Sequence, residues 1–95
     1  MTSGTDQVSE LEIVIKNSLG LHARPASMFV QLASSFDSEI IVEKEGEKVN
    51  GKSLMALLML ASGCGTLLKI KAEGPDSELA VKALAELIDS KFNEE

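Results

Sequence analysis

The only histidine of the chain, His22, lies two residues before Arg24 and three before Pro25, in the segment GLHARPA. Apolar residues at helical spacing predict that a helix begins at about Ala23, and a helix N-terminus offers backbone N–H groups to a phosphate. Pro25, which has no N–H group, suits the first turn and disfavours helical angles at Arg24, which would direct that side chain toward His22. A guanidinium binds phosphate oxygens with fixed geometry, and a neutral imidazole can attack phosphorus. These residues therefore predict a phosphate-accepting histidine beside an anion site.

Plainer interpretations of His22 also exist. A lone histidine at a helix start is more often a cap or a structural residue. A metal site is disfavoured because the chain has no second histidine and its single cysteine, Cys64, is distant in sequence. We expect no metal and no cofactor, and the lack of a glycine-rich nucleotide loop disfavours direct use of ATP. The pattern favours a carrier between proteins over a stand-alone enzyme such as a small phosphatase.

The composition narrows the class of protein. The chain has 95 residues, 44% hydrophobic but only 3% aromatic, which predicts one domain with an aliphatic core. One cysteine permits no internal disulfide, and we find neither a signal-peptide pattern nor an apolar run of about 20 residues, so a cytoplasmic protein is expected. A net charge of −6 and few aromatic side chains argue against binding to nucleic acid, and no membrane association is expected.

The segments that position these residues alternate between strand and helix patterns. We expect a flexible lead-in over residues 1–9, strands over 10–16, 39–44, 47–50 and 66–73, helices over 23–34 and 53–60, and a last helix that ends before a frayed tail at 93–95. Asp76 is expected to cap that last helix. The order βαββαβα favours a single α+β domain over residues 10–95, with a mostly antiparallel sheet and helices on one face.

Two stretches, GLHARPAS at residues 20–27 and GKSLMALLML at residues 51–60, resemble the HPr family, the histidine-containing phosphocarriers of the bacterial phosphotransferase system. The resemblance extends over about residues 9–92. It implies an open-faced β-sandwich, in which three helices cover one face of a four-stranded antiparallel sheet. It further implies that enzyme I phosphorylates His22 at Nδ1 with a phosphoryl group drawn from phosphoenolpyruvate, that Arg24 is the active-centre arginine, and that the acceptor is an enzyme IIA domain.

The second stretch admits two interpretations. The resemblance implies that Leu54, Met55 and Leu58 form an exposed apolar surface that docks both partners, with Lys52 beside it. Such an apolar helix is also expected to bury part of its surface in the core, so only the remainder is available for docking. Ser53 is expected as the N-cap of this helix on structural grounds alone. In some relatives the matching serine is phosphorylated by a serine kinase, and dephosphorylated by a phosphorylase, to regulate transfer; here that role stays open.

The chain also departs from many family members. Gln31 and Ser34 stand where many sugar-type relatives carry lysines, which leaves Arg24 and Lys52 as the nearby positive charges and disfavours strong steering toward an acidic partner. The apolar run of the second stretch and the acidic C-terminus are more like the nitrogen-type branch. Whether the chain serves sugar uptake or nitrogen and carbon regulation stays open, as does a purely regulatory binding module. We expect a monomer, and we assign no function to Cys64.

Overall fold

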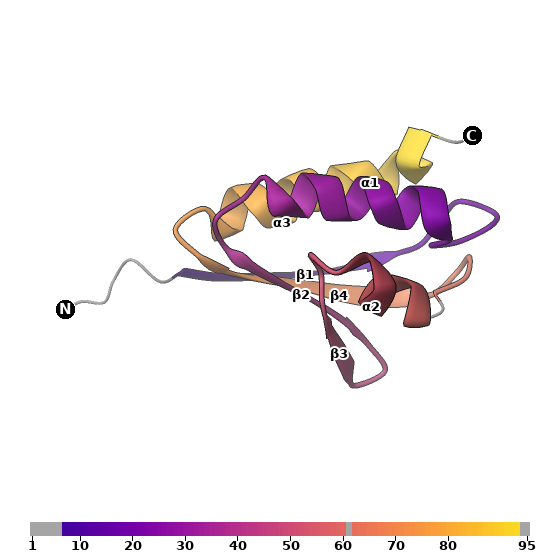
Figure 1. The fold of residues 1–95 in the computed structure, drawn as a ribbon, viewed down its shortest axis with the longest axis horizontal. Coiled ribbons are helices and arrows are strands. Elements are labelled where there is room, and N and C mark those ends of the chain that lie inside the picture. The colour runs from indigo at the N-terminus through magenta and orange to yellow at the C-terminus, as the bar shows by residue number, and fades with distance from the viewer. Residues whose placement is uncertain (1–6, 61, 94–95) are drawn as a thin grey trace.

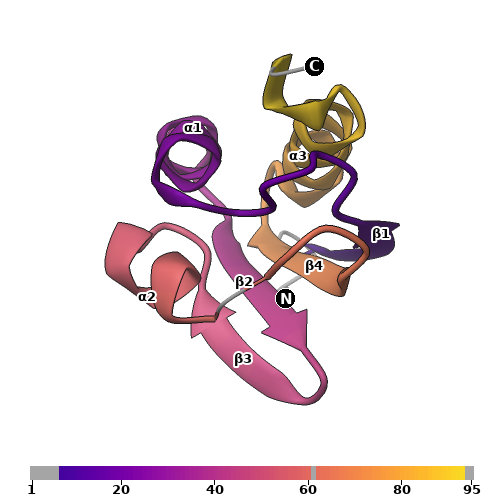
Figure 2. The same cartoon turned by 90° about the vertical axis from the view of Figure 1, so that its right-hand side faces the viewer.

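An antiparallel sheet with the strand order β1-β4-β2-β3 forms one layer of the molecule, and the helices lie on one of its faces (Figures 1 and 2). The structure is a computed structural model that describes residues 7–60 and 62–93. Its elements, in chain order, are β1 (Gln7–Val14), α1 (Ala23–Ser34), β2 (Glu39–Lys44), β3 (Glu47–Asn50), α2 (Leu54–Met59), β4 (Leu67–Gly74), α3 (Ser77–Asp89) and a short turn at Lys91–Asn93. This arrangement is the open-faced β-sandwich that the resemblance to the HPr family implies.

The predicted elements agree with the observed ones most closely between residues 23 and 60. The bounds of α1, β2 and β3 match the prediction, and α2 follows Ser53 and ends before Leu60. The first strand differs, because it begins at Gln7 and pairs with β4 from there. Residues 7–9 therefore belong to the sheet, which corrects their assignment to a flexible lead-in; residues 1–6 lie outside the described residues.

The core lies between the sheet and the helices and is mainly aliphatic. Alternate residues of β4 face the helices, and α1 and α3 each contribute one apolar stripe. The fully buried apolar side chains include Ile15, Ala26, Phe29, Ala33, Ile40, Val42, Leu57, Leu68, Ile70, Ala72, Ala80, Leu84, Ile88 and Phe92. Phe92 reaches the core because the backbone takes left-handed angles there, with φ of 55°. Two phenylalanines thus supplement a core that composition predicts to be aliphatic.

None of the helices in the described part of the chain has the length and hydrophobicity needed to cross a lipid bilayer. The longest helix, α3, has 13 residues. About 20 residues would be required.

Asp76 is the N-cap residue of α3, as predicted, but its carboxylate makes no capping hydrogen bond to that helix. One oxygen instead accepts hydrogen bonds from the Ser38 N–H at 2.9 Å and the Ser38 hydroxyl at 2.5 Å, and the other accepts the Asp37 N–H at 2.9 Å. The Ser38 hydroxyl and these N–H groups hold the pKa of Asp76 below its usual value. Asp76 therefore joins the α1–β2 connection to the turn before α3.

We expect Asp76 to make the folding stability depend on pH in the acidic range. A carboxyl group whose pKa is lower in the folded state stabilises the fold above its unfolded-state pKa of about 3.9, and this contribution is lost as pH falls through the lower folded-state value. Asp76→Asn should therefore lower the Tm at pH 7 and make the Tm less sensitive to pH below about 4. Thermal unfolding followed by circular dichroism between pH 2 and pH 7 measures both effects.

Asp89→Asn is the matched control, because Asp89 is an exposed carboxylate that pairs with Lys16 at the surface. Exposed ion pairs contribute little to stability. If Asp76→Asn and Asp89→Asn lower the Tm equally at pH 7, the hydrogen bonds at Ser38 do not have the role assigned to them.

Candidate functional site

His22 occupies the N-cap position of α1, as the sequence predicts for this helix start. Its backbone is extended, with φ of −88° and ψ of −167°; its N–H donates to the Gly20 carbonyl at 3.0 Å and its own carbonyl accepts the Ala26 N–H at 2.9 Å. The imidazole is half-buried and makes no capping hydrogen bond to the helix. The side chain is therefore not used to cap α1.

The first turn of α1 offers backbone donors directly after His22. Within the described part of the chain, no acceptor receives the N–H groups of Ala23 and Arg24, while Pro25 is buried and has no N–H group. This turn contains no acidic residue. Helix N–H groups without partners and the partial positive charge of the helix end favour an anion at this position. The backbone next to His22 can therefore hold phosphoryl oxygens.

Arg24 lies within α1, at its second residue, and its side chain is exposed. The expectation that Pro25 turns Arg24 away from helical geometry was wrong, because the helix already includes Ala23 and Arg24. Its guanidinium forms no ion pair within the residues that the structure describes. It is therefore available to a ligand that approaches the N-terminus of α1, with a geometry suited to two phosphate oxygens.

The loop that carries His22 is joined to the loop that follows α2. The Leu21 N–H donates to the Ser62 carbonyl at 2.7 Å, and Ile15 exchanges hydrogen bonds with the 65–66 segment at 2.8 and 2.9 Å. Both loops lie at the same end of the molecule (Figures 1 and 2). These contacts fix the backbone before His22 relative to α2, although the two segments are about 40 residues apart in sequence.

Gly20 allows this contact. Its φ is +73°, and a Cβ atom placed on it would lie 2.6 Å from the Gly63 Cα and 2.6 Å from the Ser62 carbonyl oxygen. A larger residue would therefore collide with backbone that cannot move cheaply. The buried Asn17 side chain donates to the Gly20 carbonyl at 2.6 Å and completes the turn. The close approach that glycine permits here is to the chain's own backbone.

Helix α2 presents two different faces. Ser53 is its N-cap, as predicted, and its hydroxyl accepts the Ala56 N–H at 3.2 Å. Leu57 and Leu60 are buried in the core, whereas the exposed apolar side chains are Leu54 at 40%, Met55 at 70%, Leu58 at 40% and Met59 at 77%. The structure therefore exposes the three residues predicted for docking, together with Met59. Helical spacing could have identified Met59, because it lies one turn after Met55.

Lys52 does not lie beside His22. Its ammonium group is half-buried and donates to the Phe36 carbonyl at 2.7 Å, just after the C-terminal end of α1. His22 lies at the other end of this 12-residue helix, a separation of about 18 Å. Of the two positive charges predicted near the first helix, Arg24 therefore lies at its N-terminal end and Lys52 just beyond its C-terminal end. A contact of Lys52 with partners stays a prediction.

The acidic residues are distributed unevenly along the chain. None of the 15 acidic residues lies in segments 17–36 and 48–72, which supply His22, α1 and α2. A doubly charged phosphoryl group therefore meets no carboxylate on the segments that form this site. This favours the approach of an anion although the chain as a whole carries a charge of −6.

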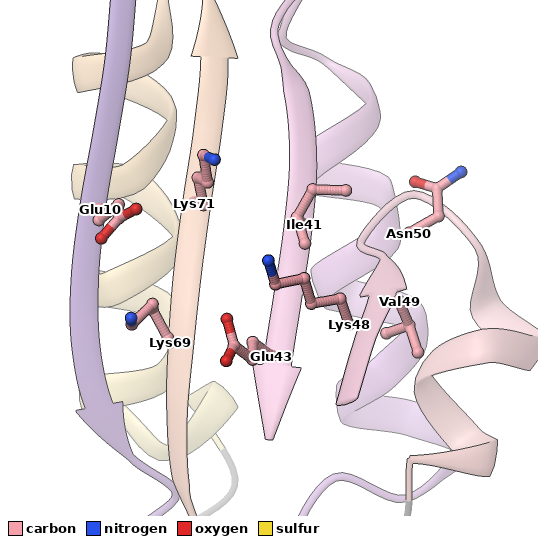
Figure 3. Close-up of a pocket in the computed structure, with 8 residues that line it drawn as sticks. All are labelled: Glu10, Ile41, Glu43, Lys48, Val49, Asn50, Lys69 and Lys71. Carbon is pink, nitrogen blue, oxygen red and sulfur yellow. The ribbon is translucent and has the colours of Figure 1, made fainter. Parts of the chain in front are cut away.

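A hollow of about 290 Å³ lies on the face of the sheet opposite the helices (Figure 3). Its floor includes Ile41, and lysines and glutamates from neighbouring strands surround it. Glu10 lies opposite Lys71 in the sheet, and Glu43 lies opposite Lys69. Because opposite charges alternate across this face, it is close to neutral and suited to contact with water. It includes neither His22 nor Arg24.

Comparison with known proteins gives a consistent result. A family model described as the PTS HPr component phosphorylation site matches residues 9–90. The phosphocarrier protein HPr of Treponema pallidum is 44% identical over 81 residues, which cover 85% of this chain and 92% of that protein. The crystal structure of HPr from Thermoanaerobacter tengcongensis is 55% identical, with a TM-score of 0.89 and coverage of 92% and 98% of the two chains. A second structure from that organism, described as an HPr dimer, is 56% identical, with a TM-score of 0.74 and coverage of 86% and 94%.

Proposed function

Because this chain belongs to the HPr family of phosphocarriers of the phosphotransferase system, we propose that His22 accepts a phosphoryl group from enzyme I and passes it to an enzyme IIA domain. The observation that carries this proposal is the position of His22 as the N-cap residue of α1, directly before Ala23 and Arg24, whose N–H groups have no acceptor among the described residues. The function of a family does not by itself fix the roles of residues, which depend on the geometry of the individual chain.

The transfer needs a nucleophile and a site for negative charge. The imidazole lone pair, on Nδ1 by resemblance to the family, forms a bond to phosphorus as the bond between phosphorus and the donor breaks. The electron pair of the broken bond stays with the donor. The N–H groups of Ala23 and Arg24 and the Arg24 guanidinium hold the phosphoryl oxygens while charge redistributes. Transfer to the acceptor repeats these events with the roles exchanged, and the Nδ1–P bond breaks.

The partners reach His22 across the exposed face of α2. Leu54, Met55, Leu58 and Met59 form a contiguous apolar surface on this helix, which we call the docking patch. Met side chains adapt to more than one partner, which suits a carrier that must bind a donor and an acceptor in turn. The contacts between the two loops hold this patch and His22 in one fixed arrangement.

Labelled phosphoenolpyruvate and enzyme I test the proposal directly. After incubation with both, each molecule of this chain should carry one acid-labile phosphoryl group. Addition of an enzyme IIA domain should then remove that group. Sugar-type and nitrogen-type enzyme IIA domains, offered separately, identify the branch that the chain serves. A protein that acquires no acid-labile label from phosphorylated enzyme I would be a binding module of this fold and not a carrier.

A regulatory role for Ser53 is a further part of the proposal. Ser53 is half-buried at the N-terminus of α2, next to the docking patch. A phosphoryl group on its hydroxyl would suit the helix end but would place about two negative charges beside an apolar surface. It would therefore preserve the fold and weaken docking. A serine kinase and a phosphorylase would be the corresponding partners.

Two substitutions separate the effect of charge from the loss of the cap. Aspartate and asparagine are both good N-cap residues, so Ser53→Asp and Ser53→Asn should each keep the Tm close to that of the parent chain. Only Ser53→Asp adds charge, and it should raise the KM of the chain for phosphorylation by enzyme I severalfold. Equal KM values for the two variants would exclude an electrostatic switch at this position.

A further inference from the structure

Asn17 is the largest of the fully buried polar side chains in the part of the chain that the structure describes. Asparagine is mostly an exposed residue, and burial of its amide costs free energy unless the amide is hydrogen-bonded. The Asn17 Nδ2 donates to the Gly20 carbonyl at 2.6 Å, and the Gly20 N–H donates to the Asn17 carbonyl at 3.0 Å. A turn requires only the second of these hydrogen bonds, so the turn alone does not explain the buried amide.

The Gly20 carbonyl oxygen is shared between Asn17 and His22. It accepts the Asn17 amide at 2.6 Å and the His22 N–H at 3.0 Å. The His22 carbonyl accepts the Ala26 N–H at 2.9 Å, which is part of the regular hydrogen bonding of α1. The backbone of His22 is therefore held by α1 on one side and by the Gly20 carbonyl on the other, and the Asn17 amide orients that carbonyl.

The peptide group between Gly20 and Leu21 depends on such a restraint. Gly20 has a φ of +73°, and glycine changes between backbone conformations more readily than other residues. The Leu21 N–H, on one edge of this peptide group, donates to the Ser62 carbonyl at 2.7 Å, while the carbonyl edge is held by Asn17. Among the hydrogen bonds of the described residues, removal of the amide would leave the carbonyl edge only the one from the His22 N–H, which is the group to be fixed.

We propose that Asn17 is a positioning residue for phosphoryl transfer at His22 and acts through the Gly20 carbonyl. This inference rests on the function proposed above. Transfer needs the imidazole lone pair aligned with the bond that breaks, and a misplacement of about 1 Å can slow a reaction about 100-fold. Because the Asn17 side chain is fully buried, a partner that docks on the surface does not touch it. Its effect should therefore fall on kcat and not on KM.

Asn17→Ala tests the inference, and Ser77→Ala is its matched control. Ser77 is also fully buried, and its hydroxyl is hydrogen-bonded to the Ser9 hydroxyl at 3.2 Å. It lies at the start of α3, at the end of the molecule away from the start of α1 (Figure 1). In rapid-quench phosphorylation by enzyme I, Asn17→Ala should lower kcat about tenfold and leave KM within about twofold of the parent value. Ser77→Ala should lower the Tm and change neither constant.

Hydrogen exchange of the His22 backbone N–H, measured by NMR, is a second readout that needs no partner. This exchange should be faster in Asn17→Ala than in the parent chain and unchanged in Ser77→Ala, because the N–H donates to the carbonyl that Asn17 orients. If Asn17→Ala does not fold, Asn17→Ser replaces it, since serine keeps a hydroxyl donor and forms turns well. It should show the same division between kcat and KM, with a smaller fall in kcat of about threefold.

Three outcomes would overturn the inference. A folded Asn17 variant with the kcat of the parent chain would show that the amide contributes to stability alone. A raised KM at unchanged kcat would show that the turn affects docking and not alignment. Equal losses of kcat in Asn17→Ala and Ser77→Ala would reduce the effect to general destabilisation. Failure of the proposed function is a separate result, because the parent chain would then acquire no label, while hydrogen exchange would still report whether Asn17 fixes the backbone of His22.

Discussion

His22→Ala should abolish acid-labile phosphorylation of the chain by enzyme I and phosphoenolpyruvate. The chain has no other histidine, so no second imidazole can take over the reaction. The expected loss is complete because the substitution removes the nucleophile, and the remaining N–H groups and Arg24 have nothing to act on. The measurement is incorporation of labelled phosphate before and after treatment with acid, compared at equal protein concentration.

The fold of the variant should survive, because the His22 imidazole makes no capping hydrogen bond to α1. Changing an N-cap residue without a side-chain cap should alter stability by less than about 1 kcal/mol. His22→Asn is the control, since asparagine is a good N-cap but a poor nucleophile toward phosphorus. Acid-labile label that persists in both folded variants would place the phosphoryl group on another residue. Acid-stable label would instead indicate a serine, with Ser53 the first to examine.

Arg24→Ala should lower kcat for phosphorylation of His22 by about 10²–10³, the effect typical of removing one group that stabilises charge in a transition state. The Arg24 side chain is exposed and forms no ion pair with the described residues, so its removal should leave the Tm nearly unchanged. The loss should fall mainly on kcat and not on KM, since the guanidinium acts on the phosphoryl group in transfer. Rapid-quench measurement with phosphorylated enzyme I separates the two constants.

Arg24→Lys distinguishes charge from geometry. Lysine keeps the positive charge but lacks the planar fork that contacts two oxygens, so it should recover only part of the rate. Lys48→Ala is the matched control, because it removes a positive charge from the open face of the sheet, where Lys48 lines the hollow of Figure 3. If Lys48→Ala slows transfer as much as Arg24→Ala, the arginine acts only through the overall charge of the chain.

The site residues that the sequence predicts are those whose roles depend on local structure. His22 at a helix start and Ser53 as an N-cap were predicted correctly, because caps and apolar periodicity are set within a few residues. The same local rules determine the bounds of α1, β2 and β3. The start of β1 was not predicted, because residues 7–9 become strand only by pairing with β4, more than 60 residues later.

The tertiary structure determined those features that depend on contacts between residues distant in sequence. In the run LMALLML every position is apolar, so periodicity cannot separate the buried Leu57 from the exposed Met59; only the surfaces that α2 covers do so. The Asp76 carboxylate could have accepted a hydrogen bond from the first turn of α3, but it accepts hydrogen bonds from the Ser38 N–H and hydroxyl instead.

The role of His22 depends on both its neighbours in sequence and the tertiary structure. Its identity, its helix start and its neighbour Arg24 follow from a few consecutive residues, and they indicate the chemistry of a phosphate acceptor. The surface through which a partner reaches it depends on the contact of Gly20 with Ser62 and Gly63, which lie about 40 residues away. No local pattern encodes that contact, because it exists only once the sheet and the helices have packed together.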